Sequence, residues 1–365
     1  MLMNLNVLRA FAALCVVYYH TTSEAGLNLP ISVGTRGVDV FFVISGFIIT
    51  FASCRNPDQF FLRRLIRIVP FYWAATAVVF AIALVVPNLF HNTRADFVQL
   101  ICSLFFIPRE TAYAGMFPTL VLGWSLNYEM YFYLVFALSL LVDKKRAPII
   151  CSLLIVAVMV AIANIDSSNP TLNFYGRGIV VEFVFGVIAY YLVRWLEQNR
   201  MRLPARRVGI PLLVLGMLVA CVLLAVGEYY KGFGLPREIS AGVPALMLVA
   251  SAILIERIYD VSVKNQMLML VGESSYILYL IHPYVVYGIL RTVFRNASGF
   301  GALSTAALVT ALLVISTLVA VAIHLFFEKP VMAFLRRHLL RPRVAEIAEK
   351  LHDPALPAPA PTIGG

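Results

Sequence analysis

The sequence predicts an all-α polytopic membrane protein, a bundle of about ten transmembrane helices with both termini in the cytoplasm. The first observation is composition, because 61% of the 365 residues are hydrophobic and only 13% are charged. Soluble domains are about 45–50% apolar and about 25% charged. A water-facing globule cannot bury so much apolar surface, which excludes a soluble enzyme and a chain disordered over most of its length.

The second observation is the spacing of apolar runs, since about 20 apolar residues form a helix that crosses the hydrocarbon core. The run 97–107 is too short to cross, and we expect a re-entrant or interfacial segment there. The predicted spans are 5–22, 37–53, 68–90, 120–142, 148–164, 177–195, 208–227, 242–257, 270–292 and 303–328.

The third observation is the distribution of charge. With ten spans and a cytoplasmic N-terminus, 20 of the 29 Lys and Arg residues fall on the cytoplasmic side and 8 on the other side. The positive-inside rule therefore favours this topology. It also accounts for the net charge of +10 without a nucleic-acid partner.

We expect one transmembrane domain over 1–330, followed by a cytoplasmic tail over 331–365 that is first basic and then Pro/Ala-rich and partly disordered. The five cysteines are widely separated and show no metal-ligand spacing, so no metal site is predicted.

The first predicted span carries two ionisable residues, Arg9 and His20. Residues 11 apart lie on one helix face, about 16 Å apart along the axis. Ionisable groups inside a span are costly and indicate function. The alternatives are that Arg9 extends to the inner headgroups and that His20 is an interfacial histidine bonded to a carbonyl.

The second span begins with Asp39 on the side where the first span ends. A carboxylate beside an imidazole can fix its tautomer and stabilise its charged form. The alternative is that Asp39 is the N-cap of this helix. Gly37 and Gly46 predict close helix approach.

A basic cluster, Arg63, Arg64 and Arg67, follows in the next predicted loop. Its i,i+3 and i,i+4 spacing gathers the guanidinium groups on one helical turn, and arginine suits bidentate phosphate binding. The alternative is positive-inside charge that contacts anionic lipid.

Two later spans carry the remaining polar candidates. Glu129 lies about 13 Å into its span, on one face with Ser125 and near Trp124 and Asn127. The span 270–292 holds Tyr276 and His282, and the following Pro283 frees a backbone carbonyl. At the end of the last span, Glu328, Lys329 and Pro330 are predicted to stop the helix.

Six short motifs in this order resemble the integral-membrane acyltransferase-3 family, and the stretch from Leu122 to Phe136 resembles more narrowly its succinoglycan-type exopolysaccharide O-acetyltransferase branch. They span residues 8 to 330. The motifs are Leu8-Arg9-Ala10 with His20, Gly37-Val38-Asp39 with Phe41 to Phe47, Arg63-Arg64 with Arg67 and Trp73, Trp124-Ser125-Leu126 with Glu129, Ser275-Tyr276 with His282, and Glu328-Lys329-Pro330.

The resemblance implies transfer of an acetyl or other short acyl group from cytosolic acyl-CoA to a sugar hydroxyl. It implies that His20 is catalytic with Arg9 as its partner, that Arg63, Arg64 and Arg67 bind the CoA donor, and that Glu129 is the motif acid. The acceptor is expected to be an exopolysaccharide, a lipopolysaccharide or a lipid-linked glycan. The expected location is the bacterial inner membrane, with no permanently bound cofactor.

Together these arguments give three groups of site residues. The catalytic group is His20, Asp39 and Glu129, the donor group is Arg9, Arg63, Arg64 and Arg67, and the substrate group is Trp124, Ser125, Asn127, Tyr276 and His282. Whether His20 acts as a base or carries the acyl group stays open, as does the choice of Asp39 or Glu129 to orient it. Membrane lipid and polysaccharide-synthesis proteins are the other expected partners.

The main alternative is a transporter or flippase for a sugar-lipid or anionic cargo, which intramembrane Arg, His and Glu would also suit. Transporters often show internal repeats, and no repeat is found in this sequence. A membrane scaffold, the third reading, needs no ionisable stripe.

Overall fold

The computed structural model describes residues 2–24, 34–87, 89–90, 93–165, 167–293 and 302–340. In these ranges the regular secondary structure is helical, and an isolated bridge between Thr111 and Gly115 is the one strand-like pairing. The fold class predicted from composition is thus confirmed as all-α.

Seven helical segments of the described residues are long and apolar enough to cross a membrane, so the chain is a multi-pass membrane protein. Five coincide closely with predicted spans. The seven are α2 (Gly37–Arg55), α3 (Phe60–Val85), α5 (Trp124–Val142) with its preceding turn η1 (Val121–Gly123), α8 (Val181–Gln198) with η2 (Gly178–Val180), α9 (Arg206–Tyr229), α10 (Val243–Arg257) with η5 (Glu238–Gly242), and the long helix formed by α13 (Ala302–Ile323), η7 (His324–Glu328) and α14 (Lys329–Leu339).

The other three predicted spans are also helices, but they fall outside those seven. They are α1 (Met3–Glu24), which carries Arg9 and His20, and the shorter α6 (Ala147–Ala163) and α12 (Ser275–Val293). The count of ten spans and the cytoplasmic termini therefore stay predictions.

Short helices complete the described fold. The segment expected at 97–107 is the short helix α4 (Phe97–Leu104), whose N-cap Asp96 accepts a hydrogen bond from the Gln99 amide. The remaining short helices are α7 (Pro170–Tyr175), η3 (Arg200–Arg202), η4 (Lys231–Gly234) and α11 (Gln266–Glu273).

Three predicted boundaries were wrong. The basic cluster lies inside α3, which begins at Phe60, and not in a loop before it. The span 270–292 is two helices, α11 and α12, with a break at Ser274. Pro330 does not stop the last helix, because it occupies the first turn of α14 after the π-helical turn η7, and the first turn tolerates proline. Residues 341–365 of the predicted tail lie outside the described residues.

Close helix crossings hold the bundle together. A Cβ added at Gly37 would lie 2.7 Å from the Ala12 carbonyl oxygen of α1, and one added at Gly46 would lie 2.1 Å from the Phe183 carbonyl oxygen of α8. Gly186 of α8 faces Gly46 in the same way. The predicted close approach at Gly37 and Gly46 is therefore confirmed.

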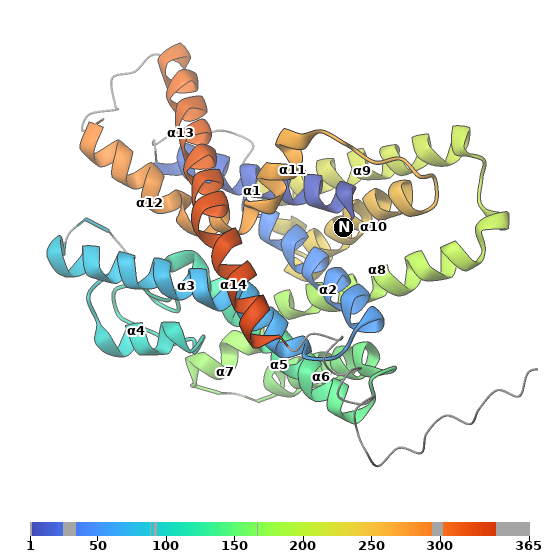
Figure 1. Cartoon of the computed structure of the whole chain (residues 1–365), viewed down its shortest axis with the longest axis horizontal. Helices are drawn as coiled ribbons and strands as arrows, with labels where there is room; N and C mark the ends of the chain where they lie inside the picture. The colour runs from blue at the N-terminus through green and yellow to red at the C-terminus, as the bar shows by residue number, and fades with distance from the viewer. Residues whose placement is uncertain are drawn as a thin grey trace, which may run out of the picture.

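Helix α1 lies at the centre of the packing, in contact with α2, α10, α11, α12 and α13. The helix formed by α13, η7 and α14 runs diagonally across the molecule, over α1 along one part and over α3 along another (Figure 1). Segments from both ends of the chain therefore meet beside α1 and α3.

Candidate active site

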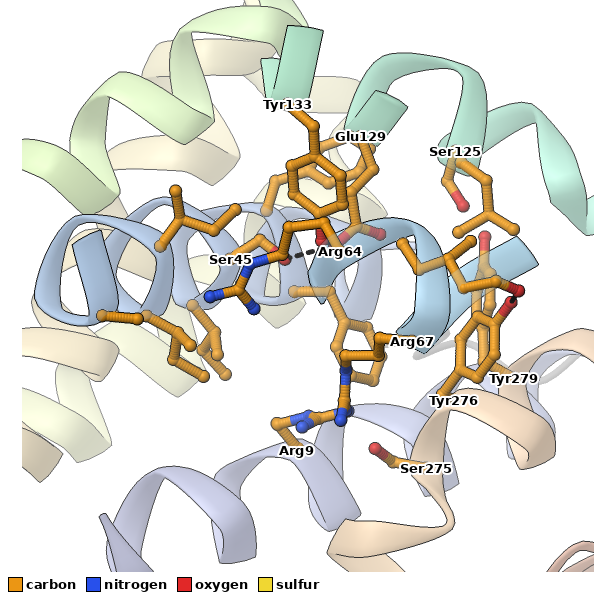
Figure 2. Close-up of a pocket in the computed structure, with 18 of the residues that line it drawn as sticks. Arg9, Ser45, Arg64, Arg67, Ser125, Glu129, Tyr133, Ser275, Tyr276 and Tyr279 are labelled. Carbon is orange, nitrogen blue, oxygen red and sulfur yellow. Dashed lines mark hydrogen bonds between the residues drawn. The ribbon is translucent and has the colours of Figure 1, made fainter. Parts of the chain in front are cut away.

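A polar cavity of about 520 Å³ opens between α1, α2, α3, α5, α12 and α14. Its walls combine apolar side chains with a dense group of polar ones (Figure 2). The polar lining residues are Arg9, Ser45, Arg63, Arg64, Arg67, Ser125, Glu129, Tyr133, Ser275, Tyr276, Tyr279 and Arg336.

Glu129 is held in this cavity by neutral hydroxyl groups. Its Oε1 accepts hydrogen bonds from Ser45 Oγ at 2.9 Å and from the Tyr133 hydroxyl, one turn further along α5. Within the described part of the chain no arginine forms an ion pair with Glu129. The carboxylate is thus positioned but not neutralised by direct contact.

The arginines of the donor group do not all have the same surroundings. Arg63 Nη2 donates to the Asn56 carbonyl oxygen at 2.6 Å, so this side chain secures the first turn of α3. Arg64 has a buried Nε that lacks a hydrogen-bond partner among the described residues. Figure 2 shows Arg67 extending across the cavity toward Arg9.

Gathering cations in a partly enclosed site is unfavourable, because charges repel more strongly in a low dielectric. An anion between Arg9, Arg64 and Arg67 would relieve this repulsion and could accept a hydrogen bond from the unpartnered Nε of Arg64. Guanidinium groups match phosphate geometry especially well. The cavity is therefore suited to a phosphate-bearing ligand.

Helix α12 forms one wall of the cavity. The Tyr276 hydroxyl donates to the Ile68 carbonyl oxygen at 2.9 Å, which ties α12 to α3. The Tyr279 hydroxyl, one turn on, is buried without a hydrogen-bond partner among the described residues. Ser125 Oγ donates to the Leu122 carbonyl oxygen at 3.1 Å and lines the same wall region.

His20 and His282 meet near the other end of α1. Their ring centroids are 5.2 Å apart. His282 is fully buried, and its Nδ1 lies 3.0 Å from the Leu278 carbonyl oxygen. Because a carbonyl only accepts, we infer that Nδ1 carries the proton and that Nε2 is left as an acceptor. Sequence reasoning selected both histidines but did not predict their contact.

Asp39 belongs to a different environment. Its two oxygens accept hydrogen bonds from Arg237 Nε at 2.9 Å and Nη2 at 2.8 Å. Asp39 is fully buried, and α2 begins two residues earlier at Gly37, so the N-cap alternative was wrong. Among the described residues neither Asp39 nor Glu129 donates or accepts a hydrogen bond with His20.

Three residues of the substrate group lie away from the cavity: His282, which lies beside His20, and two residues of α5. Trp124 packs edge-on against Tyr128, with ring centroids 6.0 Å apart. Asn127 is buried, and its amide has no hydrogen-bond partner in the described residues. Neither side chain lines the cavity that contains Ser125 and Tyr276.

Sequence reasoning missed several lining residues. Tyr133 could have been found, because it is i,i+4 from Glu129 on α5. Ser45 lies one residue before Gly46, in a motif that was read only for helix packing. Arg336 could not have been found, because the chain was expected to leave the membrane domain before it.

The fold and this site define a helical membrane protein whose ionisable residues surround an internal anion-accepting cavity. The family model described as "Acyltransferase domain" (acyltransferase-3) matches residues 3–325, and the chain belongs to this family. The chain is therefore an enzyme of the acyltransferase class, which decides against the transporter and scaffold alternatives.

Curated relatives agree with this assignment. The chain is 34% identical over 329 residues to the exopolysaccharide production protein ExoZ of Rhizobium meliloti (strain 1021), covering 86% of this chain and 94% of ExoZ. It is 27% identical over 316 residues to the O-acetyltransferase OatA of Staphylococcus aureus (strain NCTC 8325 / PS 47), covering 78% of this chain but 50% of OatA.

A third relative is the putative peptidoglycan O-acetyltransferase YrhL of Bacillus subtilis (strain 168). It is 30% identical over 199 residues, covering 47% of this chain and 30% of YrhL. No solved structure gives a significant match. The family and these relatives identify the chain as an O-acetyltransferase enzyme.

Proposed function

We propose that the chain transfers an acetyl or other short acyl group from cytosolic acyl-CoA to a sugar hydroxyl of an exopolysaccharide, a lipopolysaccharide or a lipid-linked glycan. We place this reaction in the bacterial inner membrane. The observation that carries the proposal is the convergence of Arg9 of α1 with Arg64 and Arg67 of α3 on one cavity. The other end of α1 bears His20. The similarity to an exopolysaccharide production protein supports a carbohydrate acceptor.

The donor would bind with its phosphates among the cavity arginines. Its acyl end would then point along α1 toward His20, about 16 Å from Arg9 along the helix axis. The thin pantetheine arm of CoA suits such a path. Tyr276, Tyr279 and His282 follow one another along α12, which packs against α1 and supports the same direction.

His20 could act in transfer either as a general base or as a nucleophile. As a general base it takes the proton of the sugar hydroxyl while the oxygen attacks the thioester carbonyl. The C–S bond then breaks, and the CoA thiolate leaves and takes up the proton. As a nucleophile it instead forms the acyl-imidazole, and the CoA thiolate leaves and takes up the imidazole proton. The oxygen of the sugar hydroxyl then attacks the acyl carbonyl, the C–N bond breaks, and the released imidazole takes the hydroxyl proton.

The carboxylates have separate proposed roles. Glu129 would set the charge balance of the donor cavity through its position opposite Arg9 and Arg67. The role of Asp39 in orienting His20 stays a prediction, since both of its oxygens are engaged by Arg237. We retain Ser125 and Tyr276 as substrate contacts because they line the cavity, while Trp124 and Asn127 stay predictions.

The test is an acetyl-transfer assay with the membrane-inserted protein, labelled acetyl-CoA and a panel of lipid-linked glycans. His20→Ala is expected to insert and accumulate normally but to lose transfer. His338→Ala, an exposed histidine of α14, is the matched control and should keep wild-type activity. Normal transfer by His20→Ala would remove His20 from catalysis, and absence of label transfer by the wild type to every glycan would contradict the proposed function.

A further inference from the structure

The last described helix of the chain contributes to the donor cavity. Arg336 and Leu340 line the cavity, and they lie four residues apart on one face. Their neighbours Arg337 and His338 are exposed and do not line it. Helix α14 packs against α3, which carries Arg63, Arg64 and Arg67. A segment far along the sequence thus adds a cation to a site that is already basic.

The base of α14 is fixed by buried polar contacts. His324 in the π-helical turn η7 is 5% exposed, and its Nδ1 lies 2.6 Å from Glu328 Oε2. Its Nε2 lies 3.7 Å from Glu273 Oε2 of α11. Glu328 is itself buried. The hydrogen-bonded pair lies within η7, and the longer contact places η7 beside α11.

The position of Arg336 differs from that of the inner arginines. Arg336 is exposed, whereas Arg64 is partly buried and its Nε is fully so, which indicates that Arg336 lies at the cavity rim. An arginine on an exposed helix face can extend into water, yet this one reaches a cavity that holds Arg9, Arg64 and Arg67. A ligand that brings negative charge to the rim as well as to the interior would offset this repulsion.

A CoA thioester has this distribution of charge. Its diphosphate joins the pantetheine arm to the nucleotide, and a separate phosphate sits on the ribose at the nucleotide end. If the acyl group points inward along α1, the ribose phosphate must lie nearer the rim than the diphosphate does. The inner arginines then face the diphosphate, and Arg336 faces the ribose phosphate.

We propose that Arg336 of α14 is a specificity-determining residue that binds the ribose phosphate of the CoA donor at the cavity rim. This inference rests on the proposed use of a CoA donor. It assigns α14 to the enzyme's donor site, whereas the sequence alone placed this segment in a tail.

The experiment compares acetyl-CoA with acetyl-dephospho-CoA, which lacks only the ribose phosphate, using the purified full-length protein. The variants are Arg336→Ala, Arg336→Lys and the matched control Arg337→Ala. We expect Arg336→Ala to raise the KM for acetyl-CoA about tenfold, as loss of one charged hydrogen bond does, without changing the KM for acetyl-dephospho-CoA. Arg336→Lys should be intermediate, because lysine keeps the charge but not the bidentate geometry.

Direct binding of CoA and dephospho-CoA gives a second readout that needs no turnover, and a melting curve checks the fold of each variant. Arg337→Ala should match the wild type with both donors. If Arg336→Ala weakens both donors equally, or behaves like Arg337→Ala, the assignment of Arg336 is overturned while the CoA donor stands. If the wild type uses neither thioester and binds neither nucleotide, the proposed donor itself is overturned, and the role of Arg336 falls with it.

Discussion

Asp39 and Glu129 are both acidic residues within the helical bundle, but their surroundings differ. Arg237 occupies both oxygens of Asp39 through a bidentate pair, and Asp39 is inaccessible to solvent. Glu129 instead accepts from the hydroxyls of Ser45 and Tyr133 and faces a cavity. The region around Asp39 contains its own countercharge in Arg237. The cavity beside Glu129 contains arginines that form no ion pair among the described residues.

This difference shows how two carboxylates that both lie in predicted spans acquire different capabilities. A buried carboxylate whose partners are complete contributes mainly to the structure, and losing one partner is costly. A carboxylate held only by neutral groups beside unpaired cations can respond to a charged ligand. We therefore expect substitutions at Asp39 to affect stability first and substitutions around Glu129 to affect turnover and donor binding.

The largest expected effect is that of Asp39→Asn on stability. Breaking a buried ion pair costs about 3–5 kcal/mol, and we expect about 3 kcal/mol because the Arg237 side chain is 38% exposed and can reach water. Denaturant unfolding in detergent measures the loss, and activity per folded molecule should stay within about twofold, or about 0.4 kcal/mol. A stable variant with little turnover would instead favour the predicted role of Asp39 in orienting His20.

The next largest effect is expected on acetyl-CoA binding in the cavity that contains Glu129. Replacing Arg63, Arg64 and Arg67 together by alanine should raise the KM for acetyl-CoA roughly a hundredfold, or about 2.7 kcal/mol, with a smaller change for the acceptor. This estimate assumes that only Arg64 and Arg67 contact phosphate, because Arg63 donates to the Asn56 carbonyl oxygen.

The matched control for this variant is alanine at Lys144, Lys145 and Arg146, three exposed basic residues on a different segment. It removes the same charge without touching the cavity. Equal effects of the two triple variants would show that the α3 cluster acts only through general positive charge.

Glu129→Gln should have a smaller effect, and on turnover. Glutamine keeps the size of the side chain and a hydrogen-bond acceptor but not its charge. We expect normal abundance and melting with turnover at least about tenfold lower, or about 1.4 kcal/mol of barrier. Glu197→Gln, at a partly exposed carboxylate paired with Arg257, is the control. Near wild-type turnover in folded Glu129→Gln would exclude this residue from the site.

Asp96 is a carboxylate outside the predicted spans, and its substitution should have the smallest effect on folding stability. The amide of Gln99 and the guanidinium of Arg109 hold the pKa of Asp96 below its usual range. The resulting stabilisation is present above the ordinary aspartate pKa of about 3.9 and is lost as the pH falls through the lower folded value.

At neutral pH, Asp96→Ala should cost about 1 kcal/mol through loss of the cap of α4. Asp96→Asn keeps a capping oxygen and should cost less. Unfolding measured between pH 6 and about pH 3 should show the difference between wild type and Asp96→Ala shrinking toward the acid end. A constant difference would mean that the charge of Asp96 plays no part.

Long apolar runs made most of the helices predictable, because their length and hydrophobicity suit a membrane whatever their neighbours are. The sequence also showed that Arg9 and Glu129 interrupt those runs and that Arg67 lies just before one, and these three residues share one cavity. Spacing along one helix was sufficient to predict that Arg9 and His20 share a helix face, since helix geometry alone relates their positions.

Contacts between distant segments could not be derived in this way. Arg237 is 198 residues from Asp39, and nothing in either local sequence indicates their pairing. The meeting of His20 with His282 depends on how α1 packs against α12. Arg336 reaches the cavity because the helix continues from η7 into α14, with Pro330 in the first turn of α14, where the sequence predicted a helix end.

The crossing of α2 and α8 at Gly46 and Gly186 has a mechanical consequence. Backbone touches backbone there, and a Cβ added at Gly186 would lie 2.3 Å from the Val43 carbonyl oxygen. Such a crossing leaves no side-chain layer that could slide, so we expect α2 and α8 to move as a single rigid body. If helices moved to expose a central site first to one side of the membrane and then to the other, α2 and α8 would have to move together.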